Sequence, residues 1–442
     1  MPRRRKRKLI EQPLELTIED LSHDGRGIAR INGKVMFVTG ALPNEKVRAK
    51  HTGGNKNFEE ACIIEVIEAS PDRVEPQCQF YHNCNGCSMM HLAPQKQIDF
   101  KQNTLKQNLL KMAKTKPQQW LPVLQADSWH YRRRARLSVR WVIAKDKVLV
   151  GFREKNGRYV ADMDYCKVLQ QPLDDLLQPL AKMIETLRIK QHIPQIEASI
   201  ADNGVALIIR HLKPLPESDE KNMLEFATNN KVRIYLQAKG PKTITELTTL
   251  NKPLFFDMKP FAIKMQFLPS DFIQVNAKMN DKMIHQAIEL LQLNPSDVVL
   301  DLFCGLGNFT LPIAQKVKKI IGVEGEKSLI ERARNNATLN TINNAAFYEA
   351  DLTKNHSQSA WFKHDFSKIL IDPPRSGAWE ILPLIAASSA KTLLYVSCHP
   401  ASLARDSDRL VNEYGFQLQK AGVMDMFPHT SHVESMALFV RK

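Results

Sequence analysis

The chain has 442 residues, enough for about three domains, and 62 Lys and Arg against 47 Asp and Glu give it a formal net charge of +15 at pH 7. No apolar run approaches the ~20 residues of a membrane span, and no apolar segment follows the basic N-terminus as in a signal peptide, so neither class is expected. The positive charge favours a polyanionic partner, although a merely soluble basic surface would give the same total.

A basic tail and a small β domain are predicted at the N-terminus. The first ten residues, MPRRRKRKLI, form either a solvated arm or an arm that binds nucleic acid. In residues 11–70, Leu14, Leu16 and Ile18 alternate with polar residues, and glycines punctuate further short strands, which is typical of a small OB-like β-barrel. The stretch IEDLSHDGRGIARINGKVMFVTGALPNEKVRAK resembles a TRAM domain, an RNA-binding barrel. Without that resemblance, a structural barrel and an RNA-binding barrel are equally open.

Three of the seven cysteines lie within ten residues, in the spacing C-x5-C-x2-C. An odd number of cysteines in a long chain argues against a disulfide framework and favours the reducing cytosol, where clustered thiols serve metals or catalysis. Four thiolates hold either zinc or an iron–sulfur cluster, and a three-plus-one arrangement modestly favours the cluster. The candidate ligands are Cys78, Cys84, Cys87 and Cys166, with His82 and His91 as alternatives to the fourth thiol.

Residues 71–270 are predicted to form a central α+β domain that carries this cysteine cluster. An amphipathic helix is expected over 94–115. The stretch WHYRRRARLSVRW at 129–141 is predicted to be a strand whose arginines contact RNA phosphates and whose aromatic residues stack on bases, although a solvated edge strand is the alternative. In that strand Arg132, Arg134 and Arg136 would share one face, and Arg133 would lie on the other.

From residue 271 to residue 442, strands and helices alternate as in a parallel, Rossmann-like α/β sheet. A strand predicted at Val298–Phe303 leads into a Gly-x-Gly turn, which lets backbone approach a ligand closely. A dinucleotide fingerprint has a third glycine where this chain has Thr310, so a pyrophosphate ligand is not favoured. Acidic strand ends favour a cofactor with ribose hydroxyls and a cationic amino-acid end, which S-adenosylmethionine fits. These residues are Asp301, Glu324, Asp351 and Asp372.

Cys398 follows a predicted buried strand, Leu393–Val396, and precedes a helix that begins near Ser402. Ligands of an open α/β sheet bind at the carboxyl ends of its strands. A free thiol at such a place is either a small buried side chain or an exposed nucleophile, and for a lone cysteine burial is the commoner case.

Several motifs of the chain together resemble the uracil-5 RNA methyltransferases, and among them the type that acts on 23S rRNA. They are the TRAM-like barrel, the cysteine cluster, QVN, DLFCGLGNFTLP, IDPPR, SC-x-P-x-x-LARD and DMFPHTSHVE. The resemblance implies that a thiolate adds to C6 of uracil and that C5 then takes a methyl group from S-adenosylmethionine before a base removes the C5 proton. It implies Cys398 as nucleophile and Glu434 as base; Gln274, Phe303, Asn308, Glu324, Asp351 and Asp372 as cofactor-binding residues; and Cys78, Cys84, Cys87 and Cys166 as ligands of a [4Fe–4S] cluster.

Covalent catalysis requires a thiol with a lowered pKa. Arg375, in the neighbouring strand-end loop, and the start of the helix after Cys398 are expected to supply positive potential. Two positions depart from the family pattern, because His399 stands where Asn is more common and Ile273 where a second Phe is more common. His399 either perturbs Cys398 or replaces an amide that caps the turn. Cys304 is interpreted as a packing residue and Cys62 as part of the barrel core.

The resemblance implies a monomeric cytoplasmic enzyme whose partner is 23S rRNA and which does not contact a membrane. Two alternatives stay open. A tRNA-directed or other 23S-directed uracil-5 methyltransferase would share the catalytic half, although such relatives usually lack the barrel, the cluster or both. A non-catalytic iron–sulfur protein that binds RNA on a methyltransferase scaffold is the alternative of another class, and the presence of Cys398, Glu434 and Asp372 argues against it.

Overall fold

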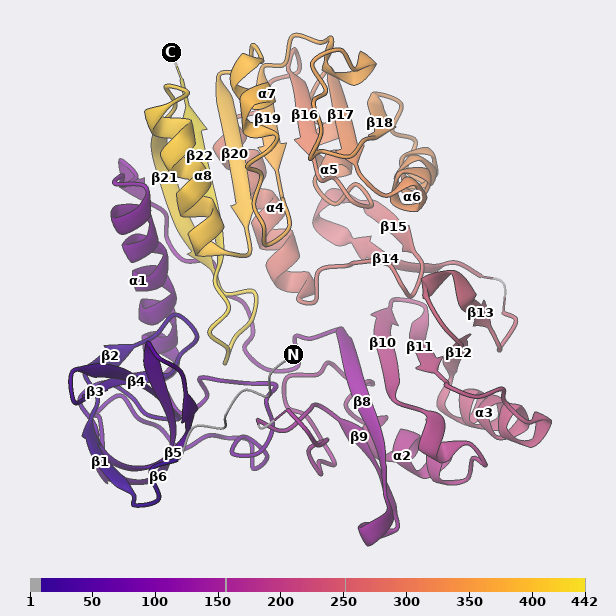
Figure 1. Ribbon diagram of the computed structural model, residues 1–442. Helices are drawn as coiled ribbons and strands as arrows, with labels where there is room; N and C mark the ends of the chain where they lie inside the picture. The colour runs from indigo at the N-terminus through magenta and orange to yellow at the C-terminus, as the bar shows by residue number, and fades with distance from the viewer. Residues whose placement is uncertain (1–8, 156, 251, 442) are drawn as a thin grey trace, which may run out of the picture. The chain divides into compact units, whose positions relative to one another are not determined.

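The computed structural model describes residues 9–155, 157–250 and 252–441 (Figure 1). The greater part of the predicted basic tail, residues 1–8, lies outside the described residues. The chain divides into two compact units. The first contains the residues up to Thr104 together with Phe427–His432, and the second contains Leu105–Met426 together with the residues from Val433 onward. The domain boundaries expected near residues 70 and 270 stay predictions.

The first unit contains a six-stranded, strongly curved sheet in the order β1-β5-β6-β4-β3-β2 (Figure 1). Alternate residues of its strands, among them Leu16, Met36 and Val47, point to one side and form a closed apolar core, as the period-2 pattern predicts. A two-residue hairpin at Asn32-Gly33 joins β3 to β4, with both residues at positive φ. The strands are β1 (Leu14–Thr17), β2 (Asp20–Leu21), β3 (Gly27–Ile31), β4 (Lys34–Thr39), β5 (Lys46–Gly54) and β6 (Phe58–Glu68).

The assignment of Cys62 to the barrel core is wrong, because its side chain is exposed. Ala61, the residue before it on β6, is buried in the core, and the strand period therefore turns Cys62 to the outer face. Pro94–Met112 forms helix α1, close to the predicted span.

The second unit begins with a six-stranded mixed sheet in the order β13-β12-β11-β10-β8-β9. Helix α2 packs against it through Leu177, Leu180 and Ile184, which recur at helical spacing and are buried. The elements are β8 (Arg134–Val142), β9 (Lys147–Gly151), α2 (Leu177–Glu185), β10 (Gln195–Ala201), β11 (Gly204–Arg210), α3 (Glu217–Asn230), β12 (Val232–Gln237) and β13 (Ile244–Glu246).

The same unit contains an eight-stranded sheet in the order β18-β17-β16-β19-β20-β22-β21-β7. Strands β16 to β20 run parallel, whereas β22 is antiparallel to both of its neighbours. The strand order reverses beside β16, which is where ligands bind in such sheets. The strands are β7 (Gln119–Trp120), β16 (Val298–Leu302), β17 (Lys319–Glu324), β18 (Ala345–Glu349), β19 (Lys368–Ile371), β20 (Thr392–Ser397), β21 (Gln417–Met424) and β22 (Glu434–Val440).

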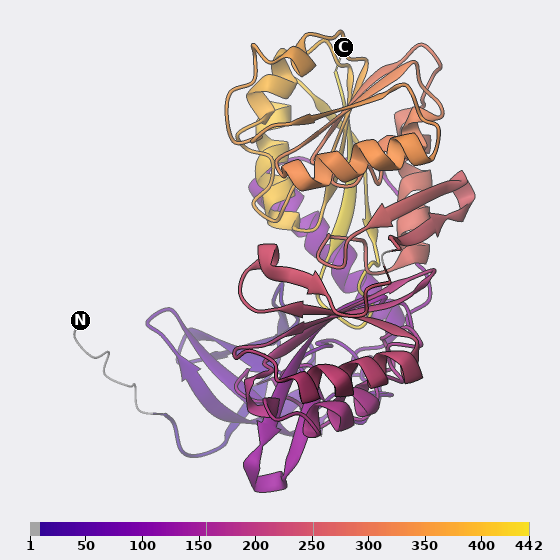
Figure 2. The same ribbon diagram turned by 90° about the vertical axis from the view of Figure 1, so that its right-hand side faces the viewer.

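Helices cover both faces of this sheet, with α4 and α8 on opposite sides (Figure 2). The predicted Rossmann-like α/β architecture is therefore confirmed. A hairpin of β14 (Leu254–Met258) and β15 (Ile263–Phe267) precedes it. The helices are α4 (Ala277–Leu291), α5 (Thr310–Ala314), α6 (Lys327–Leu339), α7 (Leu382–Ala387) and α8 (Pro400–Asn412). Among the described residues, no helix combines the length and the apolar character that crossing a membrane requires.

Candidate active site

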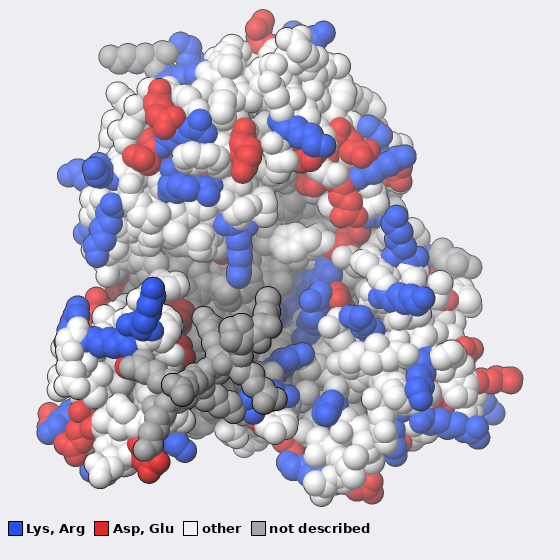
Figure 3. Space-filling model, in the orientation of Figure 1, with Lys and Arg blue, Asp and Glu red and all other residues white. Residues whose placement is uncertain are grey.

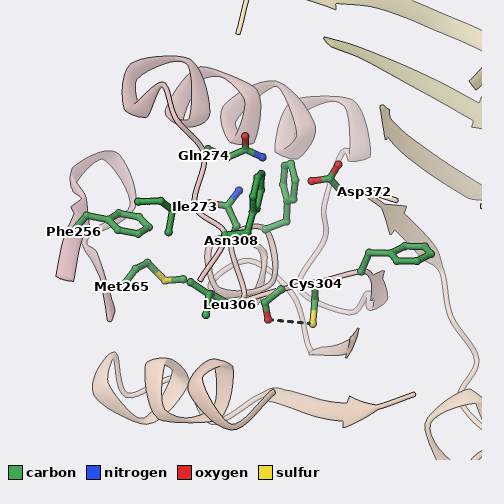
Figure 4. Close-up of a pocket in the computed structure, with 12 residues that line it drawn as sticks. Phe256, Met265, Ile273, Gln274, Cys304, Leu306, Asn308 and Asp372 are labelled. Carbon is green, nitrogen blue, oxygen red and sulfur yellow. Dashed lines mark hydrogen bonds between the residues drawn. The ribbon is translucent and has the colours of Figure 1, made fainter. Parts of the chain in front are cut away.

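The turn after β16 forms one wall of a pocket at the carboxyl edge of the large sheet (Figure 4). Phe303, Gly305 and Gly307 all have positive φ, at 64°, 54° and 92°. Two of these positions suit glycine, whereas Phe303 is held in the left-handed region while its backbone N–H donates to the carbonyl of Val323 at 2.8 Å. The alternation turns the chain sharply and presents its backbone to the pocket.

Four of the six predicted cofactor-binding residues line this pocket: Gln274, Phe303, Asn308 and Asp372. Figure 4 shows Gln274, Asn308 and Asp372 around one cavity, together with Ile273 and with Phe256 and Met265 from the β14–β15 hairpin. A pocket with apolar walls and a few amide and carboxylate groups suits a ligand with one flat apolar part and one polar part.

Glu324, at the end of β17, is tied to the same turn although it does not line the pocket. Its carboxylate accepts hydrogen bonds from the backbone N–H of Gly305 at 3.2 Å and of Gly325 at 2.7 Å. Asp351 lies apart from them on an exposed turn. Its carboxylate accepts from the backbone and the hydroxyl of Thr353, and these bonds lower the pKa of Asp351. The structure thus groups Glu324 with the turn and places Asp351 outside the pocket lining.

Burial raises the pKa of the two other acidic residues of this edge. Asp372, directly after β19, is half-buried and its pKa is raised to about 7. Asp301 is fully buried within β16, where Thr310 donates a hydrogen bond to it at 2.5 Å and its pKa is raised to about 8. Asp301 therefore holds the first residue of α5 from inside the sheet, whereas Asp372 lines the cavity.

A reciprocal pair of amides that the sequence analysis missed holds Asn308. The side chains of Asn280 and Asn308 donate to each other, both bonds being 2.9 Å long. Asn280 is buried in the first turn of α4, and a polar residue on the buried face of that helix was the available signal. The pair fixes which way the amide of Asn308 points at the pocket edge.

Cys398 and Glu434 come together because β20 and β22 are neighbours. In the antiparallel register Ser397 faces Ser435, so the residue after β20 and the first residue of β22 meet at the same edge. Cys398 is half-buried, and both Glu434 and Asp372 act electrostatically on its thiol. The predicted nucleophile and the predicted base therefore lie together, next to Asp372 of the pocket.

The thiol of Cys398 has a raised pKa of about 11. Burial is the largest cause, and the charges of Glu434 and Asp372 raise the pKa further. Arg375 lowers it, which is the sign predicted for that residue. The expected net lowering is wrong for the protein by itself, because one guanidinium does not offset burial and two carboxylates.

His399 caps helix α8 and connects the cysteine turn to the neighbouring loop. Its Nδ1 accepts from the backbone N–H of Ser402 at 3.3 Å and lies 2.8 Å from the Ser402 hydroxyl. That hydroxyl lies 2.7 Å from the backbone carbonyl of Arg375, to which it donates. Of the two roles considered for His399, the turn-capping role is present in the structure.

A buried carboxylate, also missed by the sequence analysis, fastens the same loop. Asp406 accepts from the backbone N–H of Ala378 at 2.7 Å and from the hydroxyl of Tyr395 at 2.8 Å, and it pairs with Arg405. The loop that carries Arg375 is thus fixed to both α8 and β20. In the sequence, the charged pair Arg405-Asp406 within the apolar pattern of α8 was the signal that could have predicted this contact.

The arginine-rich stretch differs from its prediction in one respect. The predicted strand begins only at Arg134, and Arg133, predicted on its opposite face, lies buried just before it. The Nε of Arg133 donates to the carbonyl of Gln274 at 2.9 Å, and its guanidinium lies 4.3 Å from the ring centre of Phe256. Burial lowers the pKa of Arg133 to about 10. This arginine supports the pocket wall, so it cannot bind phosphate.

The Arg133→Met variant is expected to lose about 2–4 kcal/mol of unfolding free energy, because a charge-assisted hydrogen bond and a desolvated cation–π contact both disappear. Cofactor affinity should fall as well, since Gln274 loses its backbone support. Urea unfolding and calorimetric titration with S-adenosylmethionine measure the two effects. The Arg140→Met variant, at an exposed position of β8, is the control and should change neither.

The cysteine cluster provides suitable donors without forming a metal site in the described residues. Within the described residues no cysteine forms a disulfide, and the backbone N–H of Gly86 donates to the sulfur of Cys84 at 3.3 Å. Among residues 9–155, 157–250 and 252–441, no three His, Cys, Asp or Glu side chains are gathered in a geometry that could hold a metal. His91, one of the alternative ligands, is engaged through Nδ1 with the hydroxyl of Tyr81 at 2.5 Å.

Comparisons with known proteins give a consistent result. A family model described as tRNA (Uracil-5-)-methyltransferase matches residues 93–442, and a TRAM domain model matches residues 7–61. The chain is 48% identical over 442 residues to the 23S rRNA (uracil(1939)-C(5))-methyltransferase RlmD of Xanthomonas campestris pv. campestris (strain 8004), covering 99% of this chain and 100% of the relative. The protein of the same name from Stenotrophomonas maltophilia (strain R551-3) is 47% identical with the same coverage.

Among solved structures, the chain is similar to the Pyrococcus abyssi tRNA (uracil-54, C5)-methyltransferase, which was crystallised in complex with S-adenosyl-L-homocysteine. The TM-score is 0.74, and the match covers 97% of this chain and 100% of the other. The two sequences are only 22% identical, so this likeness shows the fold alone.

Proposed function

The chain belongs to the tRNA (uracil-5-)-methyltransferase family, and from this we propose that it methylates C5 of a uracil in 23S rRNA with S-adenosylmethionine as methyl donor. The relatives' names point to uracil 1939 as the target, and such a substrate places the enzyme in the cytoplasm. The observation that carries the proposal is the meeting of Cys398 and Glu434 at one sheet edge, beside a pocket lined by Asp372.

The proposed chemistry assigns a separate task to each residue. The sulfur of Cys398 forms a bond to C6 of uracil, which makes C5 nucleophilic. The proposed residues that would hold S-adenosylmethionine are Gln274, Phe303, Asn308, Glu324, Asp351 and Asp372. When bound, the cofactor would give its methyl group to C5 and leave as S-adenosyl-L-homocysteine. Glu434 then takes the proton from C5, and the C6–S bond breaks to release the thiolate.

The charges near Cys398 determine when its thiol can react. A thiol with a pKa of about 11 is protonated at neutral pH, so it reacts only once a base has taken its proton. Asp372, with a pKa of about 7, changes its charge at the working pH. A cationic sulfonium beside Asp372 would offset the negative charge that raises the pKa of Cys398.

Methylation assays with two RNA substrates test the proposal and its alternatives. Purified protein with labelled S-adenosylmethionine should form 5-methyluridine in unmodified 23S rRNA and not in unmodified tRNA. Methylation of tRNA alone, or at another 23S site, would favour a related specificity. An intact protein that binds RNA and transfers no methyl group would favour the non-catalytic alternative.

We place the main RNA contact of the second unit on the exposed face of β8. Arg136 and Arg140 point outward there, and the side chain of Arg136 is 70% exposed even though it pairs with Glu197 at 2.9 Å. Arg134 is only 17% exposed and is held by Glu197 and the carbonyl of Ser270. Figure 3 shows basic side chains gathered over this part of the molecule. The barrel is the proposed second contact.

Replacing Arg136 and Arg140 with Gln should reduce the slope of log affinity against log salt by about 1.5, because two phosphate contacts are lost. Fluorescence titration of a 23S rRNA fragment at several salt concentrations measures the slope. The matched control replaces Lys182 and Lys221 on helices α2 and α3, which are also exposed. An equal slope in wild type, variant and control would remove β8 from the RNA-binding surface.

We further propose a [4Fe–4S] cluster held by Cys78, Cys84, Cys87 and Cys166. The support is the family resemblance together with cysteines at all four positions, three of them within ten residues and none in a disulfide among the described residues. When bound, the cluster would serve as a structural support, and no catalytic step depends on it.

Protein purified without oxygen should be brown and contain about four iron and four sulfide per chain. The Cys78→Ser variant should lose most of both, whereas Cys62→Ser, at an exposed thiol of the barrel, should keep them. Metal analysis and visible absorption give the result. A colourless wild-type protein with one zinc would contradict the cluster.

A further inference from the structure

Helix α6 binds the outer edge of strand β15 through a row of polar side chains. Among the described residues, β15 pairs only with β14, so its backbone groups on the other side need different partners. Asn340 serves Lys264: its Oδ1 accepts from the backbone N–H and its Nδ2 donates to the carbonyl, both at 2.8 Å. Asn336, one helical turn earlier, makes the same two bonds with Gln266, at 2.8 Å and 3.1 Å. The two asparagines therefore take the place of a third strand.

Arg332, one further turn toward the start of α6, continues the row. Its guanidinium donates to the carboxylate of Asp271 at 2.6 Å, and that carboxylate accepts from the backbone N–H of Leu268 at 2.7 Å. Leu268 directly follows β15, and the segment that it begins leads to Gln274 of the cofactor pocket. The three side chains of the row are four residues apart, so they share one face of the helix, and this face lies along the strand.

Asn336 differs from the other two residues because it also contacts the cofactor turn. It is fully buried, and its Nδ2 donates a second, longer hydrogen bond to the backbone carbonyl of Leu306 at 3.5 Å. Leu306 lines the cofactor pocket, and so does Met265, the neighbour of Gln266 on β15 (Figure 4). One buried amide therefore joins two walls of the pocket that are far apart in the sequence.

An amide is the side chain that suits this place. The backbone of Gln266 presents one donor and one acceptor, and the carbonyl of Leu306 is a second acceptor. A carboxylate has no hydrogen to donate to either carbonyl, and an apolar side chain leaves all three backbone groups without this partner. Such groups then need water, and a close-packed interior admits water only if the two walls move apart.

We propose that Asn336 is a positioning residue for the methyl donor, because it sets the spacing between the hairpin wall and the turn wall of the pocket. The inference rests on the proposed function, since it concerns the same cofactor in the same pocket. Asn336 acts through Met265 and Leu306, which line the cavity. Without the amide, binding of S-adenosylmethionine must also restore the spacing of the walls, and this weakens the affinity.

The test compares Asn336→Leu with Asn340→Leu. Leucine keeps the branched shape of asparagine without its polar groups, so both variants lose their bonds to β15, but only Asn336→Leu loses the contact with the cofactor turn. Calorimetric titration with S-adenosylmethionine should show about 10- to 100-fold weaker binding to Asn336→Leu, and binding within about twofold of wild type for Asn340→Leu. Urea unfolding should show that both variants are less stable, so stability alone does not give this order of affinities.

A second pair of variants, Asn336→Ser and Asn340→Ser, serves if leucine is not accommodated. A serine hydroxyl is too short to hold both backbone segments at once, so Asn336→Ser should bind S-adenosylmethionine about 3- to 30-fold weaker, whereas Asn340→Ser should bind it as wild type does.

Methyl transfer to RNA gives a result that a general loss of structure would not. For the Asn336 variants, kcat at saturating S-adenosylmethionine should stay within about threefold of wild type, while KM for the cofactor rises with its dissociation constant. A merely unstable protein would show the reverse, with a lower kcat from a smaller folded fraction and an unchanged KM.

The proposal is overturned if a folded Asn336 variant binds S-adenosylmethionine as tightly as wild type, or if the Asn340 variants lose as much affinity. It is also overturned if neither Asn336 variant folds while the Asn340 variants do, because Asn336 would then serve the whole fold and not the pocket. Cofactor affinity is measured without RNA. A protein that shows the predicted affinities but transfers no methyl group would contradict the proposed function and leave the role of Asn336 in place.

Discussion

The Cys398→Ala variant is expected to lose methyl transfer to 23S rRNA by at least about a thousandfold, because no other group can form the bond to C6. Cys398 lies directly after β20, and the charges of Glu434 and Asp372 raise the pKa of its thiol. Cys304, the thiol in the turn after β16, is buried, and burial raises its pKa well above the ordinary value. It therefore cannot replace Cys398.

Labelled methyl incorporation measures this loss, and a trapping experiment identifies its cause. In RNA with 5-fluorouridine at the target, C5 carries fluorine in place of the proton that the base must remove, so the C6–S bond cannot break. Wild type should therefore remain covalently attached, whereas Cys398→Ala should form no complex. The rate of attachment should rise between about pH 6 and pH 9, because the thiol has a pKa of about 11 and the thiolate fraction grows with pH. Cys62→Ala is the matched control and should behave as wild type.

A Cys398→Ala variant that keeps near-normal methyl transfer would contradict the covalent scheme. Preserved cofactor affinity in the variant shows that the loss lies in chemistry and not in folding. If the variant loses cofactor binding as well, thermal unfolding distinguishes a damaged fold from a damaged pocket.

The Glu434→Gln variant is expected to lower kcat by about 100- to 10,000-fold, because a neutral amide cannot accept the proton from C5. The first methyl transfer should still occur, so a covalent protein–RNA complex that carries the methyl group should accumulate. The charge of Glu434 raises the pKa of Cys398. Its removal should therefore lower the thiol pKa, and attachment should be at least as fast as in wild type.

Single-turnover labelling followed by denaturing electrophoresis separates the two effects. The complex should contain label in the Glu434→Gln lane and almost none in the wild-type lane. Glu413→Gln, at the exposed residue that follows α8 and pairs with Arg409, is the control and should turn over normally. A variant that is slow but accumulates no complex would assign the proton transfer to another group.

The two units of the chain contain different parts of the proposed RNA-binding surface. The second unit contains the whole proposed reaction site together with the basic face of β8, and so it can hold both the reacting base and its flanking phosphates. The barrel is a separate core, with its own closed set of apolar residues. A polyanionic substrate accounts for the net charge of +15, which neither core requires.

Local pattern was sufficient for much of the fold and for the cofactor turn. The period-2 alternation of Leu14, Leu16 and Ile18 predicted a barrel strand, and Gly305 and Gly307 do adopt positive φ where the turn requires it. The Rossmann-like order of strands followed from alternating elements of suitable length. Such features depend on neighbours in the chain, and short-range sterics and side-chain period therefore determine them.

Register and burial were decided by the tertiary structure. Ser397 faces Ser435 across a strand pair formed by residues almost forty positions apart, and only that pairing brings Glu434 to Cys398. Arg133 looked like one more exposed arginine in WHYRRRARLSVRW, but the strand begins one residue later and the guanidinium turns inward to the pocket wall.

By itself the sequence determined which residue types were present for catalysis and cofactor binding, and a family resemblance indicated their roles. It did not determine the pKa of Cys398, which the sequence predicted to be lowered and which is raised to about 11. Nor did it reveal Asn280 or Asp406. Burial and the distances between charges set these properties, and both exist only after distant segments have packed together.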